Sequence, residues 1–70
     1  MDSFKDFCKK FKAKYADDYR CDFINESLPD YAFPWDGQNW EAIDYLESCG
    51  ADSNCIKCYQ ELKDLYDLNV

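Results

Sequence analysis

Cysteines are the side chains of this 70-residue chain with the most obvious capacity for chemistry, and there are five of them. Cys49, Cys55 and Cys58 fall close together, and the last two form a CxxC pair. With Cys8 or Cys21 as a fourth thiolate, the group could hold a tetrahedral zinc ion, and the CxxC pair could act in redox chemistry. The spacing is not that of a zinc ribbon, and a thioredoxin-like site needs a βαβ setting. We therefore expect small core residues and predict no metal site and no cofactor.

Other groups that commonly carry catalysis are missing from the sequence. The chain has no histidine, which removes the most frequent general base and the Ser-His and Cys-His nucleophile pairs. Its two glycines, Gly37 and Gly50, cannot form a Gly-rich phosphate loop. Carboxylates are plentiful, but the sequence gives no pair held in an apolar cleft, where the pKa of one carboxyl would rise. We predict that the protein is not an enzyme and has no catalytic residues.

Rows of carboxylates are the most specific binding feature. The net charge is −7, and residues 16–70 hold thirteen of the fifteen acids, whereas residues 1–15 hold five of the eight basic residues. Acids three or four positions apart lie about 5–6 Å from each other on one face of a helix. Three such rows occur: Asp18, Asp22 and Glu26; Glu41, Asp44 and Glu47; and Glu61, Asp64 and Asp67.

These rows can be interpreted in three ways. They could simply keep outward helix faces soluble, they could bind a basic protein, or they could imitate the phosphates of a nucleic acid in a basic groove. A surface this acidic repels nucleic acid and anionic membranes. We therefore predict a protein partner with a basic surface, with no direct nucleic-acid contact and no membrane contact, and a homo-oligomer stays open. Trp35, in a loop, is a further candidate anchor for the partner.

Four helices are expected to position these residues, because apolar residues recur at helical spacing. We predict helices over about 3–15, 17–27, 39–49 and 52–68, with Ser3, Asp17 or Asp18, Asn39, and Asp52 or Ser53 as the starting residues. Gly50 stands where a left-handed helix end is wanted. No segment alternates polar and apolar residues as a strand does. The predicted fold class is all-α, a compact, irregular four-helix bundle in one domain over residues 1–70.

The inner faces of these helices define an expected core rich in aromatic residues. We also expect Phe33 and Trp40 to fold back onto the bundle, and we leave the place of Trp35 open. The expected inner residues are Phe4, Phe7, Cys8, Phe11, Tyr15, Tyr19, Phe23, Ile24, Leu28, Ala42, Ile43, Leu46, Cys49, Cys55, Cys58, Tyr59, Leu62, Leu65 and Tyr66.

A cytoplasmic location is expected from three features of the chain. No run of about 18 apolar residues could span a membrane. The first residues lack the basic and then apolar segments of a signal peptide. An odd number of cysteines fits a reducing compartment.

The layout of aromatic and turn residues resembles a known family. Phe33-Pro34 is followed by Tyr45-Leu46, with Trp40 and Ile43 between them, and then by Gly50, Tyr59 and Tyr66; Ser3-Phe4-Lys5-Asp6-Phe7 and Asp30 also fit. This pattern resembles the YozE family of small bacterial and phage proteins, whose fold is similar to a sterile alpha motif (SAM-like). The likeness covers nearly the whole chain and departs from the family at Cys21, Pro29 and Lys63.

The resemblance implies a SAM-like fold but no activity and no catalytic residues. Sterile alpha motif domains mostly bind other proteins, often each other, and occasionally RNA, and a fold does not by itself fix function. We predict a small non-enzymatic module that acts by protein–protein interaction. The alternative is an acidic, nucleic-acid-mimicking inhibitor from a phage or mobile element, of the anti-CRISPR or anti-restriction type, that occupies a basic groove of a host nuclease complex.

Overall fold

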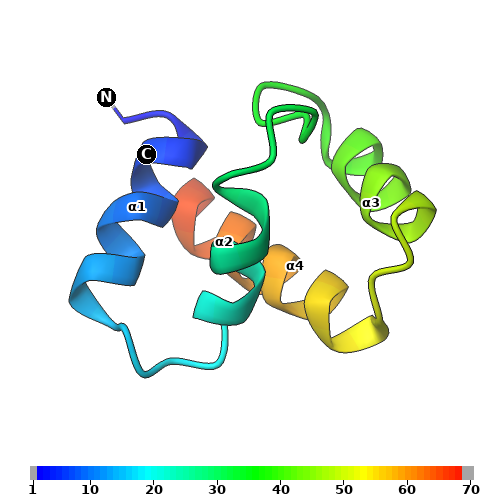
Figure 1. Cartoon of the computed structure of the whole chain (residues 1–70). Helices are drawn as coiled ribbons and strands as arrows, with labels where there is room; N and C mark the ends of the chain where they lie inside the picture. The colour runs from blue at the N-terminus through cyan, green and yellow to red at the C-terminus, as the bar shows by residue number, and fades with distance from the viewer. Residues whose placement is uncertain (1, 69–70) are drawn as a thin grey trace.

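Four helices make up the computed structural model, which describes residues 2–68 (Figure 1). They are α1 (Phe4–Lys14), α2 (Cys21–Ser27), α3 (Asn39–Ser48) and α4 (Ser53–Leu68). No strand occurs within these residues. The radius of gyration of the Cα atoms is 11.1 Å, close to the value of about 11 Å expected for a compact domain of this length. The prediction of an all-α, compact fold is confirmed.

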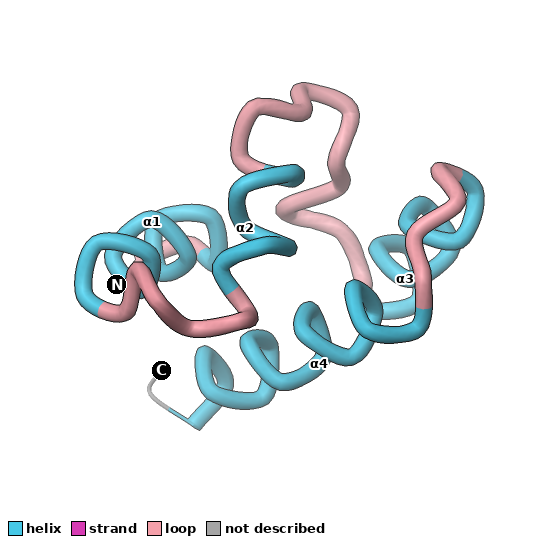
Figure 2. The backbone as a smooth tube through the Cα atoms, turned by 60° about the horizontal axis from the view of Figure 1, so that its bottom comes forward, coloured by secondary structure: helices cyan, strands magenta, loops and turns pink. Residues whose placement is uncertain are grey.

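The longest helix, α4, is the element on which the others are assembled. It packs against α1, α2 and α3, and α1 also packs against α2. In Figures 1 and 2, α1 and α3 lie toward opposite ends of α4, and α2 lies between them. The Tyr66 hydroxyl donates a hydrogen bond of 2.7 Å to the backbone oxygen of Asp2, so the end of α4 is joined to the segment before α1. Among the described helices, α3 packs against α4 alone.

Three helix ends follow from local side-chain chemistry, as predicted. The hydroxyl of Ser3 accepts a hydrogen bond of 3.2 Å from the Asp6 amide and caps α1. A carboxylate oxygen of Asp52 accepts one of 2.9 Å from the Cys55 amide and caps the start of α4. After α3, Gly50 has a φ of 80°, and the amide of Ala51 bonds to the carbonyl of Leu46 at 3.0 Å. That bond closes a left-handed helix end for which glycine is favoured.

One predicted helix start and one predicted cap are wrong. The second helix begins at Cys21 and not at Asp17 or Asp18, because the Asp18 carboxylate accepts hydrogen bonds from the backbone amide and the guanidinium of Arg20. These bonds hold the segment before Cys21 in a turn. The third helix begins at Asn39, as predicted, but its N-cap position is Gln38, whose side chain makes no capping hydrogen bond. The side chain of Asn39, predicted to be the cap, instead accepts a hydrogen bond of 2.6 Å from the Tyr59 hydroxyl.

The core is aromatic and centred on Tyr59. Its ring packs edge-on against Phe4, Phe23 and Phe33, with ring centroids 5.8, 5.6 and 6.2 Å away. Such edge-to-face pairs contribute beyond the area that they bury. Phe33 lies in this core, as predicted, although it belongs to the loop between α2 and α3. The buried hydrophobic residues are Phe4, Cys8, Phe11, Cys21, Phe23, Ile24, Phe33, Ala42, Leu46, Cys58, Tyr59 and Leu62.

Four residues predicted to face inward are exposed instead, and each lies at or beyond a helix end or on an outer helix face. Tyr15 follows the last residue of α1, and Cys49 follows the last residue of α3. Tyr19 belongs to the turn before α2, and its hydroxyl donates a hydrogen bond to Glu61. Trp40 is 67% exposed on α3. Apolar periodicity marked Tyr15, Tyr19 and Cys49 without distinguishing these positions from true inner ones, whereas Trp40 was expected to fold back onto the bundle with Phe33.

Two leucines of α4 offer a matched test of this core. Leu62 is 0% exposed, whereas Leu68 is 82% exposed. We expect Leu62→Ala to lower the free energy of unfolding by about 2–5 kcal/mol, through lost burial and the cavity left behind. Leu68→Ala should change it by less than about 0.5 kcal/mol. Urea unfolding followed by circular dichroism measures both, and equal losses in the two variants would contradict the described packing.

Candidate functional site

The exposed side of α3 carries an aromatic anchor and two acids. Trp40, Asp44 and Glu47 stand four and three positions apart, which places them on one face of the helix. All three are exposed, while Ala42 and Leu46 on the opposite face are buried. We call Trp40, Asp44 and Glu47 the α3 outer face. No other described helix covers this face, because α3 packs against α4 alone.

Trp40 lies on this face because of its position relative to the buried residues of α3. Successive residues of an α-helix are rotated by about 100°, so Trp40 points away from Ala42, two positions later. Ala42 and Leu46 pack into the core, with exposed fractions of 2% and 5%. The sequence signal that could have placed Trp40 outside was its spacing to Asp44 and Glu47, which already belonged to a predicted outer row.

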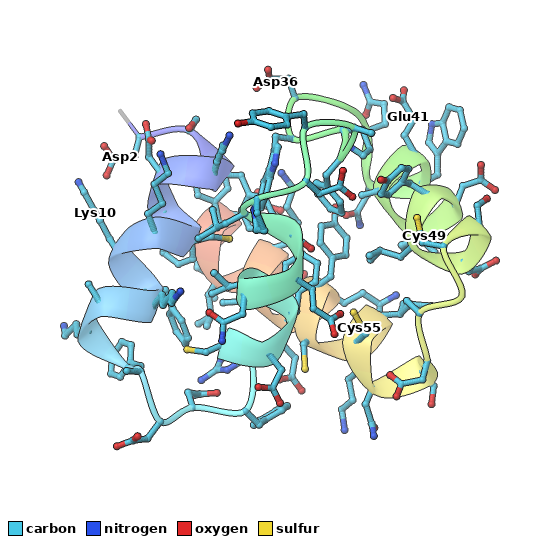
Figure 3. All side chains as sticks on the ribbon, viewed as in Figure 1. Asp2, Lys10, Asp36, Glu41, Cys49 and Cys55 are labelled. Atoms are coloured by element: carbon cyan, nitrogen blue, oxygen red, sulfur yellow. The ribbon has the colours of Figure 1, made fainter. Side chains whose placement is uncertain are left out.

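Glu41, the first acid of the predicted α3 row, takes a different direction. Its side chain is half-buried and folds toward the loop before α3, where an added Cβ on Gly37 would lie 2.5 Å from a carboxylate oxygen of Glu41. Figure 3 shows Glu41 near the loop that carries Asp36. The row therefore splits, and only Asp44 and Glu47 join Trp40.

The rows predicted on the second and fourth helices partly meet where α2 packs against α4. Burial, followed by the negative charges of Glu61 and Asp22, raises the pKa of the Cys58 thiol between them. Glu26 lies further along α2. Its negative charge adds to the effect of burial in raising the pKa of the Cys55 thiol. Asp22 and Glu26 are exposed and Glu61 is half-buried. These three acids form a short negative strip, whereas Asp64 and Asp67 are exposed further along α4.

Asp18 does not extend this negative strip, because Arg20 neutralises it. The two side chains form an ion pair at 2.7 Å, and each is about one-fifth exposed, at 21% and 22%. Hydrogen bonds from the Arg20 guanidinium and backbone amide lower the pKa of Asp18 to about 2. The carboxylate is therefore ionised at neutral pH, but its charge is balanced locally and is not offered to a partner.

Trp35, the predicted loop anchor, lies against the core. Its ring centroid is 4.6 Å from that of Phe33 and 5.8 Å from that of Phe4. The indole Nε1 is buried and has no hydrogen-bond partner within residues 2–68. The side chain is half-buried, so the tryptophan that is mostly presented to solvent is Trp40.

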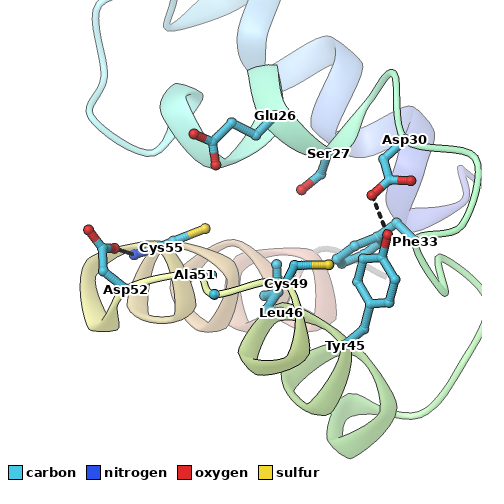
Figure 4. A pocket seen from close by; sticks show the side chains of 11 residues that line it. Glu26, Ser27, Asp30, Phe33, Tyr45, Leu46, Cys49, Ala51, Asp52 and Cys55 are labelled. Carbon is cyan, nitrogen blue, oxygen red and sulfur yellow. Dashed lines mark hydrogen bonds between the residues drawn. The ribbon is translucent and has the colours of Figure 1, made fainter.

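A polar hollow of about 420 Å³ lies between α2 and the connection from α3 to α4 (Figure 4). The Tyr45 hydroxyl closes one end by donating a hydrogen bond to Asp30, which lowers the pKa of that carboxyl and raises the pKa of the tyrosine. We call this space the polar hollow. Its lining residues are Glu26, Ser27, Asp30, Phe33, Tyr45, Leu46, Cys49, Gly50, Ala51, Asp52 and Cys55. The sequence did not predict this site, because the lining comes from separate segments of the chain.

A second, more open groove of about 610 Å³ runs along α1. Aromatic side chains and basic groups line it together: the Arg20 guanidinium lies 4.8 Å from the ring centroid of Phe11, and Lys14 lies 5.3 Å from that of Tyr15. In Figure 3, Lys10 of this groove lies on the opposite side of the molecule from Cys49. The groove gathers basic side chains of a chain that is otherwise strongly acidic.

The cysteines give no support to the zinc or redox interpretations. All five are free thiols, and Cys8, Cys21 and Cys58 are buried. Burial raises the pKa of Cys8 to about 12 and the pKa of Cys55 to about 11, whereas a redox-active thiol has a lowered pKa. Within residues 2–68, no three Cys, Asp or Glu side chains come together in a group that could hold a metal ion.

Comparisons of the chain with protein-family models, curated proteins and solved structures found no match. In the part of the chain that the structure describes, no helix combines the length and the apolar character needed to cross a bilayer.

The thiols provide a test of the site geometry. The thiolate is the reactive form of cysteine, so we expect the exposed Cys49 to be alkylated first by iodoacetamide at mildly alkaline pH. The buried Cys8, whose pKa is raised to about 12, should be among the last to react. Peptide mapping by mass spectrometry gives the order. In urea all five thiols should react at similar rates, and labelling of Cys8 as fast as that of Cys49 in the folded protein would contradict this arrangement.

Proposed function

We propose that this chain is a small, non-enzymatic, cytoplasmic helical module that binds a protein with a basic surface through the α3 outer face. The observation that carries the proposal is Trp40, which is 67% exposed and shares its helix face with Asp44 and Glu47. Tryptophan is enriched among the few residues that supply most of the energy of an interface. A partner that covered the Trp40 ring would remove its apolar surface from water, which favours binding.

The net charge of the chain indicates which kind of surface the partner has. The chain has a net charge of −7, which favours encounter with a basic surface and disfavours an acidic one. A lysine or arginine of the partner can lie over the Trp40 ring as a cation–π contact while neighbouring basic groups pair with Asp44 and Glu47. One apolar anchor flanked by acids therefore fits a basic protein segment better than it fits a nucleic acid or a membrane.

We further propose that the fold is SAM-like, of the YozE type. The order of four helices, the loop residue Phe33 in the core and the left-handed Gly50 support this assignment. The proposed interaction does not depend on it, because the α3 outer face is defined by this chain's own residues.

The second candidate is an acidic inhibitor that imitates nucleic acid and occupies a basic groove. The strip formed by Asp22, Glu26 and Glu61 favours it, because these acids belong to two helices that pack together and their charges act on two thiols of α4. Two features weigh against a continuous track of charge: Asp18 is paired with Arg20, and Glu41 folds back toward Gly37. Mimicry therefore ranks below an ordinary protein interface.

The test is affinity purification of the tagged chain from host lysate, followed by affinity measurements with the purified partner. We expect Trp40→Ala to weaken binding by about 2 kcal/mol, or roughly 30-fold. The Asp44→Lys/Glu47→Lys pair should slow association and also weaken binding. Because the anchor is apolar, binding by the unaltered chain should persist at about 0.5 M salt, where exposed charges are strongly screened.

The matched control is Asp64→Lys/Asp67→Lys, which makes the same change of charge at exposed positions of α4. This control should leave the affinity within about threefold, since exposed charges that lie outside the interface affect affinity weakly. Full binding by Trp40→Ala would overturn the proposal. Loss of binding through Asp22→Lys/Glu26→Lys, together with a steep dependence on salt, would favour mimicry instead.

A further inference from the structure

The groove that runs along α1 has an apolar floor. Phe7, Phe11 and Tyr15 follow one another at a spacing of four residues, and successive ring centroids are 6.3 and 4.9 Å apart. Leu65 of α4 lines the same groove, whose volume is about 610 Å³. We call this space the α1 groove. Tyr15 is 46% exposed, so a ligand that covered this row of rings would remove apolar surface from water.

Basic side chains converge on the same row of rings. Arg20, from the turn before α2, places its guanidinium carbon 4.8 Å from the ring centroid of Phe11, and Lys14 places its Nζ 5.3 Å from that of Tyr15. Lys10, four positions before Lys14, also lines the groove and shares that helix face. Three of the four charged residues in the lining are basic. Cations from two segments of the chain therefore meet over one apolar floor.

These cations are available to a carboxylate from outside. Asp18, the acid of the lining, accepts two guanidinium hydrogen bonds from Arg20, at 2.9 and 2.7 Å, and a guanidinium has five N–H donors. Lys10 pairs with Asp2 at 2.6 Å, but the two side chains are 70% and 49% exposed, and such surface pairs contribute little to stability. An incoming carboxylate can therefore bond to Arg20 beside Asp18 and replace Asp2 on Lys10.

The acidity of the rest of the chain does not cancel this local positive charge. At physiological ionic strength, exposed charges are largely screened beyond about 8 Å, and the described part of the molecule extends 29 Å along its longest axis. Helix α3, with its acids, lies toward the other end of α4 from α1 (Figures 1 and 2). The net charge of −7 repels nucleic acid, whose charges continue beyond the groove, whereas a short acidic segment meets mainly the local cations.

We propose that the α1 groove docks an acidic segment of a protein, in which a large apolar side chain covers the aromatic floor and flanking carboxylates pair with Lys10, Lys14 and Arg20. The row of rings selects the apolar anchor, and charge complementarity selects its acidic neighbours. The module then presents surfaces of opposite preference toward opposite ends of α4, because the α3 outer face suits a basic partner. Docking at the α1 groove does not require binding at the α3 outer face.

The test is an NMR titration of the ¹⁵N-labelled full chain with short peptides. The probe is acetyl-Glu-Asp-Phe-Asp-Glu-amide. One control peptide replaces the phenylalanine with glycine and keeps the charge, and another replaces the acids with lysines and keeps the phenylalanine. We expect saturable shifts of amides in residues 7–20. The probe should bind at least about tenfold tighter than either control, because burial of the ring and pairing of the charges both contribute.

Charge reversal on α1 tests the basic side of the groove. Lys10→Glu/Lys14→Glu should weaken probe binding by at least about tenfold. The matched control is Lys9→Glu/Lys12→Glu, which makes the same change of charge at exposed positions of the same helix outside the groove. It should keep the affinity within about threefold, since only the long-range field changes.

Removal of aromatic rings tests the floor. Tyr15→Ala should weaken probe binding by about fivefold, whereas Tyr31→Ala, at a residue that is 99% exposed and does not line the groove, should leave it unchanged. Trp40→Ala should also leave probe binding unchanged, because Trp40 does not line the groove. Loss of docking at the α1 groove and loss of the role of the α3 outer face are therefore distinguishable.

Three kinds of result would overturn the proposal. The first is the absence of saturable shifts, equal binding of the glycine peptide, or equal losses in the two lysine variants. The second is saturation by a single-stranded oligothymidylate and not by the probe, which would assign the groove to nucleic acid. The third is self-association of the chain in sedimentation velocity that Lys10→Glu/Lys14→Glu abolishes, which would assign the groove to a second copy.

Discussion

The side chain of Tyr59 is the contact on which the arrangement of the other helices depends. Its ring meets Phe4 of α1, Phe23 of α2 and Phe33 of the following loop, and its hydroxyl reaches Asn39 at the start of α3. Burial raises the pKa of this hydroxyl to about 12, so it stays a hydrogen-bond donor at neutral pH. A domain of 70 residues buries only about 60% of its unfolded surface. Large aromatic side chains compensate by burying much area per residue.

This design explains why the α3 outer face and the polar hollow both involve α3. Helix α3 is tied to α4 through Ala42 and Leu46 in the core and through the bond between Asn39 and Tyr59, and it packs against no other described helix. One of its sides is consequently exposed as the α3 outer face. The side nearer α2 leaves the space of the polar hollow, bridged at one end by Tyr45 and Asp30.

Local rules were sufficient for the sequence to predict the helices, the caps at Ser3 and Asp52 and the left-handed Gly50. They failed where a side chain has a partner that the pattern does not contain. Asp18 accepts a hydrogen bond from Arg20, so α2 begins later than predicted. The side chain of Asn39 accepts a hydrogen bond from Tyr59, twenty positions later. The rows of acids and their helices could be predicted, but not the split of the α3 row or the polar hollow, because both arise from tertiary packing.

Tyr59 holds α3 in place, and hydrogen exchange of the Tyr59→Phe variant tests this role most directly. The substitution keeps the ring and removes only the hydroxyl that bonds to Asn39, which should cost about 0.5–1.5 kcal/mol. We predict that amides of α3 lose protection through local opening, while those of α1 and of the middle of α4 change little. Unchanged protection in α3, or an equal loss in all four helices, would contradict it.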